Sequence, residues 1–140
     1  MTADPGDPPV LVDTSVWIEL LRDSEHPLRS HLENLVATDR ARICRAIVAE
    51  LIQGAVSAKD LEAAEGLAET VPLLEADDFL WLEAGRLGRR LRQKGATVGL
   101  FDCYLAALAT KHQCLLLSLD KHFAWISKAS PLLLDPRSGK

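Results

Sequence analysis

Short apolar runs alternate with longer helix-forming segments along this chain, and this alternation limits the fold class more than any other feature. The first apolar run, Val10 to Val12, stops at Asp13, and Thr14 and Ser15 then supply residues that favour a helix N-terminus. Strands and helices that alternate in this way predict a mainly parallel sheet covered by helices on both faces. We therefore assign the chain to the α/β class, as a three-layer α/β/α sandwich.

The spacing of apolar residues predicts the other elements in order. Helices are expected over about 16–21, 28–36, 46–53, 61–70, 78–94, 102–111 and 123–127, and strands or extended segments over 42–44, 71–74, 114–118 and 131–134. In the helix that begins near Asp78, the spacing of four apolar residues predicts a buried stripe. The residues of this stripe are Leu80, Ala84, Leu87 and Leu91.

Composition limits the size and the environment of the protein. The 140 residues are 48% hydrophobic, enough for one domain, which we expect over 10–135 with flexible tails at 1–9 and 136–140. No apolar run approaches the roughly 20 residues that a membrane span requires, so we expect no membrane association. The spacing of the three cysteines matches neither a zinc motif nor a disulfide framework and favours buried thiols in a reducing cytoplasm.

Acidic residues stand at the places where the predicted sheet would form a functional crevice. Asp13 directly follows one predicted strand, and Asp120 follows another after a single leucine. The crevice of a parallel sheet lies outside the carboxyl ends of its strands, so both acids should point into the same rim. Asp102 opens a helix, whose N-terminus favours an ionised carboxylate. Glu50 lies inside a helix, on a face that should look inward.

Each of these acids also has an ordinary structural interpretation. Asp13, Asp102 or Asp120 could simply cap a helix. Glu50 could be a solvated residue or the partner of Arg45 in an ion pair. Four converging carboxylates, however, would repel one another unless a divalent cation neutralised them. Oxygen ligands favour Mg²⁺ or Mn²⁺ over zinc, and such an ion predicts metal-assisted hydrolysis of a phosphodiester.

The net charge of −4 excludes a protein that holds long nucleic acid by a basic surface alone. It does not exclude a nuclease, because bound metal ions supply positive charge where the phosphate must sit. An acidic protein with a converging set of carboxylates is therefore compatible with nucleic-acid hydrolysis.

The residues that flank the four acids form four motifs. They are Val-Leu-Val-Asp13-Thr-Ser, Ala49-Glu50-Leu-Ile-Gln-Gly54, Asp102-Cys-Tyr-Leu-Ala-Ala107 and Leu-Leu-Ser118-Leu-Asp120-Lys-His-Phe123. In this order and with these neighbours, the motifs resemble those of PIN-domain ribonucleases of the VapC toxin type. The resemblance covers nearly the whole folded part and implies a PIN-like fold and a metal-dependent endoribonuclease.

The resemblance also implies roles for individual residues. The implied catalytic and metal-binding residues are all acidic: Asp13, Glu50, Asp102 and Asp120. The implied site-lining residues carry hydroxyl groups: Thr14, Ser15 and Ser118. The implied cofactor is Mg²⁺, with Mn²⁺ as the alternative. Many relatives carry a further acid two positions beyond the fourth, where this chain has His122, and this departure argues against a second tightly held metal.

Family membership further implies an RNA substrate, a homodimer, and a small antitoxin protein whose C-terminal segment occupies a groove and blocks the site. The basic cluster from Arg86 to Lys94 is either a solvated helix face or a surface that grips RNA or an acidic antitoxin segment. No histidine has a matching family position, so we expect surface or structural roles for His112 and His122 rather than general-base catalysis.

Two other functions start from similar features. A haloacid-dehalogenase-type phosphatase also places an aspartate after an apolar strand, but it needs a second acid two residues on, where this chain has Ser15. A PIN-like module without catalysis could bind nucleic acid or protein instead. The four acids favour the nuclease over both alternatives.

Overall fold

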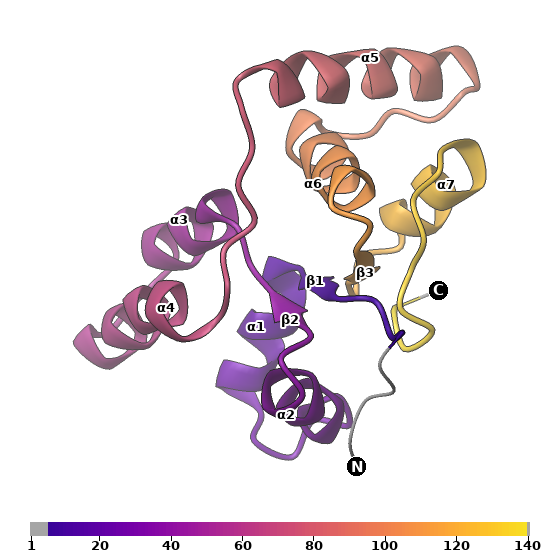
Figure 1. Cartoon of the computed structure of the whole chain (residues 1–140). Coiled ribbons are helices and arrows are strands. Elements are labelled where there is room, and N and C mark those ends of the chain that lie inside the picture. Colours follow the sequence, from indigo (N-terminus) through magenta and orange to yellow (C-terminus); the bar gives the residue numbers. More distant parts are fainter. Residues whose placement is uncertain (1–5, 140) are drawn as a thin grey trace.

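The computed structural model describes residues 6–139, so part of each expected tail, 1–5 and 140, lies outside the described residues. The described residues form seven α-helices and a three-stranded parallel sheet (Figure 1). In chain order the elements are β1 (Val10–Val12), α1 (Thr14–Arg22), α2 (Arg29–Ala37), β2 (Ala41–Arg42), α3 (Arg45–Gln53), α4 (Ala58–Thr70), α5 (Phe79–Gln93), α6 (Leu100–Lys111), β3 (Leu115–Leu117) and α7 (His122–Ala129).

The sheet has the strand order β2-β1-β3, and both pairings are parallel. All three residues of β1 are fully buried. In Figure 1 the helices gather on two sides of the strands, with α1 to α4 towards the lower left and α5 to α7 towards the upper right. This arrangement confirms the α/β class, and parallel pairing brings the carboxyl ends of β1 and β3 to the same edge of the sheet.

The expected strand 131–134 is wrong as a strand, and it touches the sheet only at an isolated bridge, as does the expected extended segment 71–74. The segment 71–74 forms one parallel bridge, between Leu73 and Ile43. The segment 131–134 forms another, between Leu134 and Leu116. Both segments contain a proline, which has no backbone N–H to donate to a ladder.

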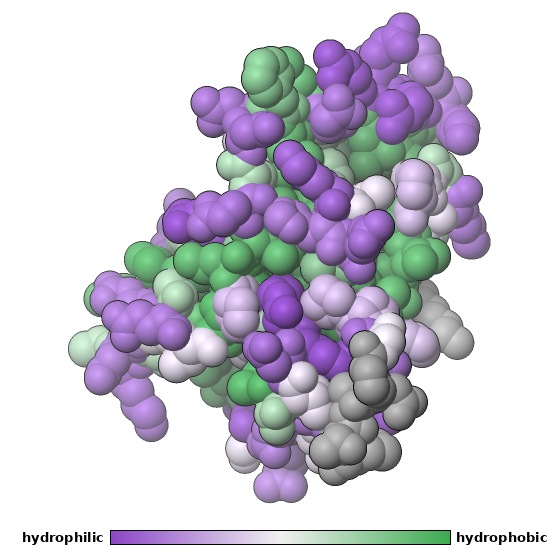
Figure 2. All heavy atoms as spheres, in the orientation of Figure 1, coloured by the Kyte–Doolittle hydropathy of each residue, from purple (hydrophilic) through white to green (hydrophobic). Residues whose placement is uncertain are grey.

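The residues of α5 divide between a buried stripe and an exposed face. All four residues expected in the stripe are buried: Leu80, Ala84, Leu87 and Leu91. On the other face Phe79 is 71% and Leu82 is 54% exposed. Figure 2 shows a hydrophobic area over the start of α5 and hydrophilic side chains over the rest of this helix. The start of α5 therefore presents apolar side chains to the solvent.

Among residues 6–139, none of the helices combines the length and the apolar character needed to cross a membrane.

Residues 136–139, which we call the C-terminal segment, are hydrogen-bonded to β3 and to the residue after it. The Ser138 hydroxyl donates to the Leu116 carbonyl at 3.0 Å and accepts from the backbone N–H of Ser118 at 3.2 Å. The backbone N–H of Gly139 donates to the Ser118 carbonyl at 2.8 Å. The end of the described chain therefore holds the strand end that carries Ser118, while the domain limits of 10–135 stay a prediction.

Candidate active site

Asp13 stands where β1 ends and α1 begins, with only 6% of its surface exposed. Among the described residues its side chain caps no backbone N–H of α1, so the helix-cap alternative does not hold for Asp13. Instead Oδ2 accepts hydrogen bonds from the Ser15 hydroxyl at 2.9 Å and from the Ser118 hydroxyl at 2.7 Å. Two hydroxyl groups therefore fix the orientation of this buried carboxylate.

Ser15 and Ser118 join the start of α1 to the loop after β3. Their hydroxyl oxygens lie 3.3 Å apart. The Ser15 hydroxyl accepts from the backbone N–H of Leu119, and the Ser118 hydroxyl accepts from the backbone N–H of Asp120, each at 3.0 Å. The network therefore places the loop that carries Asp120 against the strand end that carries Asp13.

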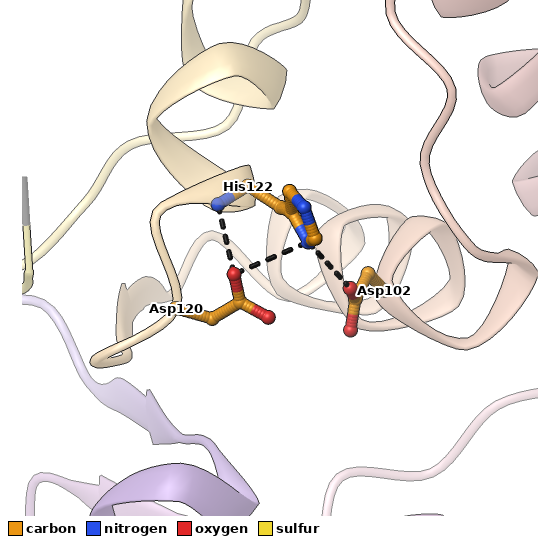
Figure 3. A group of neighbouring side chains, drawn as sticks. All are labelled: Asp102, Asp120 and His122. Atoms are coloured by element: carbon orange, nitrogen blue, oxygen red, sulfur yellow. Dashed lines mark hydrogen bonds and ion pairs between the residues drawn. The ribbon is translucent and has the colours of Figure 1, made fainter.

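Asp102, Asp120 and His122 form a compact group in which one donor atom from each side chain lies within 4.8 Å of the others (Figure 3). Asp102 comes from the first turn of α6, Asp120 from the loop after β3, and His122 from the start of α7. His122 Nδ1 lies 3.2 Å from Asp120 Oδ1 and 3.8 Å from Asp102 Oδ2. Asp120 Oδ1 also accepts the His122 backbone N–H at 2.9 Å, so Asp120 supports the start of α7 as well.

The charges of the site act most strongly on Asp102. Burial raises the pKa of Asp102 to about 6, and the nearby carboxylates of Asp120, Asp13 and Glu50 add to this rise, while His122 opposes it. We expected the N-terminus of α6 to favour the ionised form of Asp102; burial and like charges shift its pKa upward instead, although a pKa of about 6 still leaves the carboxylate mostly ionised at neutral pH. Asp102 is therefore close enough to the three other acids to be repelled by them, as expected for a site that a cation would neutralise.

Glu50 contributes to the site differently from the sequence-based expectation. We expected it to point inward, but its side chain is exposed on α3 and extends towards Thr14 at the start of α1. Glu50 Oε1 accepts a hydrogen bond of 2.7 Å from the Thr14 hydroxyl. The alternative ion pair with Arg45 is wrong, since Arg45 pairs with Glu75. Thr14 therefore ties Glu50 to the residue next to Asp13.

The donor set of this site fits a divalent cation. Carboxylate oxygens of Asp102 and Asp120 lie together with an imidazole nitrogen, and a cation would relieve the repulsion that raises the Asp102 pKa. Asp13 and Glu50 are not part of the group of Asp102, Asp120 and His122, but their negative charges contribute to the rise in the Asp102 pKa. We expected only a surface or structural role for His122, yet its imidazole lies beside Asp102 and Asp120; its position two residues beyond the fourth acid was the signal in the sequence.

Comparison with known proteins identifies the family of this chain. Residues 10–129 match the PIN domain family. Ribonuclease VapC11 of Mycobacterium tuberculosis and a VapC ribonuclease of Mycobacterium bovis are each 31% identical to this chain in alignments 127 residues long, which cover 88% of this chain and 95% of each relative. The PIN domain match covers the segments that carry all four acids.

Solved structures show the same fold. A DNA-bound VapBC complex from Salmonella typhimurium contains a chain that matches with a TM-score of 0.75 at 20% identity, covering 92% of this chain and 98% of that one. VapBC-1 from nontypeable Haemophilus influenzae matches with a TM-score of 0.71 at 22% identity, covering 96% and 97%. From its sequence match and its fold, the chain belongs to the PIN domain family, together with the VapC ribonucleases that it matches over most of its length.

Proposed function

We propose that this protein is a metal-dependent endoribonuclease and the toxin of a toxin–antitoxin pair. The observation that carries the proposal is the convergence of carboxylates on Asp102, where burial and three other acids raise its pKa to about 6. The relatives named as VapC ribonucleases support RNA as the substrate. The VapBC complexes support an antitoxin as the partner.

In this proposal the four acids and Ser118 have separate roles. Asp102 and Asp120 hold a divalent cation, Mg²⁺ or Mn²⁺, and Asp13 and Glu50 complete the acidic rim around it. Ser118 keeps Asp13 oriented through its 2.7 Å hydrogen bond. When bound, the cation would supply positive charge for the RNA phosphate and lower the pKa of the attacking water. This positive charge is needed at the acidic site because both the RNA phosphate and the protein, with its net charge of −4, are negatively charged.

A groove beside Glu50 supports the antitoxin proposal. This groove has a volume of about 260 Å³ and lies between α1, α3 and α4. Its lining combines apolar side chains such as Ile18, Leu51 and Val56 with Glu50 itself. A partner segment seated there would cover one of the four acids, which would block the site directly.

Two further features support the expected environment and assembly. The exposed Phe79 and Leu82 offer an apolar face for a homodimer. Cys44, Cys103 and Cys114 are all free and buried, which suits a reducing cytoplasm. For the basic cluster, Arg86 is paired with Glu83 at 2.7 Å, as expected for a solvated helix face.

The first experiment measures cleavage of a labelled mixed RNA pool with Mg²⁺, with Mn²⁺ and with excess EDTA. We expect the wild-type protein to cut RNA only with metal, and Asp13→Asn and Asp102→Asn to lose cleavage while keeping the circular dichroism spectrum of the fold. Asp39→Asn is the matched control: its side chain is 84% exposed, and asparagine tolerates the positive φ of 57° there.

The result separates the proposal from the alternatives. Cleavage that persists in EDTA, or in both Asn variants, would contradict the proposed site. RNA binding without cleavage under any metal condition would favour a PIN-like binding module. A phosphatase would require a second acid two residues after Asp13. Ser15 occupies that position and donates a hydrogen bond to Asp13.

A further inference from the structure

The acidic site contains an imidazole that its motif does not require. His122 stands two residues beyond Asp120, at the first residue of α7, and its Nδ1 faces both Asp120 and Asp102 (Figure 3). The side chain is 49% exposed, so nothing in the packing of the core forces it into the cluster. Its position among the acids therefore calls for an explanation beyond core packing.

The two distances from His122 Nδ1 are compatible with ligands of one ion. Ligand atoms about 2.1 Å from a common cation lie roughly 3.0 Å apart when adjacent in an octahedron and roughly 4.2 Å apart when opposite. Nδ1 of His122 lies 3.2 Å from Asp120 Oδ1 and 3.8 Å from Asp102 Oδ2, within that range. The ligand atoms of all three side chains lie within 4.8 Å of one another, so small side-chain movements would bring them into one coordination shell.

Local contacts hold the imidazole in this position. The backbone N–H of His122 is bonded to Asp120 Oδ1 at 2.9 Å, which fixes the start of α7 beside the acid. The indole of Trp125, on the next turn of α7, lies 5.7 Å from the imidazole, centroid to centroid. These contacts limit the motion of an exposed side chain, as suits a preorganised ligand.

We propose that His122 Nδ1 is a direct ligand of the cation held by Asp102 and Asp120, and that it biases the site towards transition-metal ions and away from Mg²⁺. This inference rests on the proposed metal-dependent function. Its chemical basis is that carboxylates and water suit Mg²⁺, whereas imidazole suits transition metals that bind nitrogen. The simpler role for His122 is to orient Asp120 by a hydrogen bond without touching the ion.

Metal binding measured without substrate distinguishes the two roles. Isothermal titration calorimetry at one fixed pH gives the affinities for Co²⁺ and Mg²⁺ of wild type, His122→Asp and His112→Asn. His112 is the matched control, because it lies at the opposite end of α6 from Asp102 and bonds the Glu75 carbonyl. Pulsed electron paramagnetic resonance of the Mn²⁺-loaded proteins then tests whether a ¹⁴N nucleus couples to the metal.

If His122 is a ligand, His122→Asp lowers the ratio of Co²⁺ to Mg²⁺ affinity by roughly tenfold or more, since loss of even an indirect partner of a metal ligand changes affinity by about 10- to 100-fold. The ¹⁴N coupling is present in wild type and in His112→Asn, and absent in His122→Asp. Circular dichroism confirms that each variant is folded.

The outcomes also separate this inference from the proposed function. Metal binding with an unchanged Co²⁺ to Mg²⁺ ratio and no ¹⁴N coupling would overturn the role of His122 and leave the nuclease proposal standing. Failure of the wild-type protein to bind Co²⁺, Mn²⁺ or Mg²⁺ at all would overturn both.

Discussion

The Ser118 hydroxyl donates a 2.7 Å hydrogen bond to Asp13 Oδ2 across 105 positions of the chain. The same hydroxyl accepts the backbone N–H of Asp120 at 3.0 Å. Ser118 is fully buried, so solvent does not compete for either bond. One side chain thus sets the relative position of two of the four acids and joins the carboxyl ends of β1 and β3.

Ser118→Ala should weaken both the fold and the activity. The change leaves Asp13 Oδ2 and the Asp120 N–H each without one partner, so we expect a loss of about 1–2 kcal/mol in the free energy of unfolding. Displacement of the acids should reduce RNA cleavage by roughly ten- to hundredfold. Urea unfolding and cleavage rates measure the two effects. In the control Ser127→Ala, which removes a bond to Ala124 within α7, cleavage should stay at the wild-type rate.

Asp102→Asn should stabilise the metal-free protein at neutral pH. The pKa of Asp102 is raised from 3.8 to about 6 by burial and by neighbouring acids, so in this pH window the folded protein binds more protons than the unfolded chain. The Asp102 contribution to the free energy of unfolding therefore falls as pH rises through the window. Asparagine removes this loss, which we put at about 1–2 kcal/mol after allowing for partial solvent exposure.

Urea unfolding in EDTA at pH 5.0 and 7.5 tests this expectation. The stability advantage of Asp102→Asn over wild type should be larger at pH 7.5 than at pH 5.0, and saturating metal should reverse it. Asp39→Asn should show no such pH-dependent advantage. Equal stabilities of wild type and Asp102→Asn at pH 7.5 would contradict the electrostatic account of the site.

Thr14→Val tests the link between α1 and Glu50. Valine keeps the shape of threonine but cannot donate to Glu50 Oε1, so Glu50 should lose its fixed position. We expect cleavage to fall several-fold, with less than about 1 kcal/mol change in stability because the bond is exposed. Thr110→Val, which removes a bond to Ala106 within α6, provides the comparison. Equal cleavage rates for the two variants would show that Glu50 needs no such support.

Asp135 offers a prediction about stability alone. It is 4% exposed, and its Oδ2 lies 2.7 Å from His31 Nε2. Asp135→Ala leaves His31 without its carboxylate partner and should lower the free energy of unfolding by about 2–4 kcal/mol. The surface variant Asp77→Ala, which breaks a 3.7 Å pair with Lys111, should cost less than about 0.5 kcal/mol. Thermal melts compare the two, and cleavage well below both melting temperatures should match wild type.

Elements whose signals are local could be predicted from the sequence. The β1–α1 junction follows from an apolar run, an acid and two hydroxyl residues in succession, and the stripe of α5 follows from helical spacing. The segments 71–74 and 131–134 are as apolar as strands, but strand formation depends on a partner with a matching edge. Such pairing is decided by the tertiary arrangement, which periodicity does not encode.

The candidate site shows the same division. Asp13 and Asp120 could be placed at one rim because each follows a strand of a parallel sheet. The exposure of Glu50, the rise in the Asp102 pKa and the approach of His122 depend on how α3, α6 and α7 pack around that rim. These distances arise between segments far apart in the chain, and no spacing within one motif reports them.

The contacts of the C-terminal segment affect how the protein should be produced for such experiments. A side chain at Gly139 would place its Cβ 2.7 Å from the Leu119 carbonyl oxygen, so only glycine fits this close approach. An affinity tag fused after Lys140 would begin two residues after Gly139 in the sequence. Gly139 lies against Leu119, the residue before Asp120. A tag at the N-terminus adds no residue beside Gly139 in the sequence, and a protein that is inactive only when tagged at its C-terminus should not be mistaken for one that lacks nuclease activity.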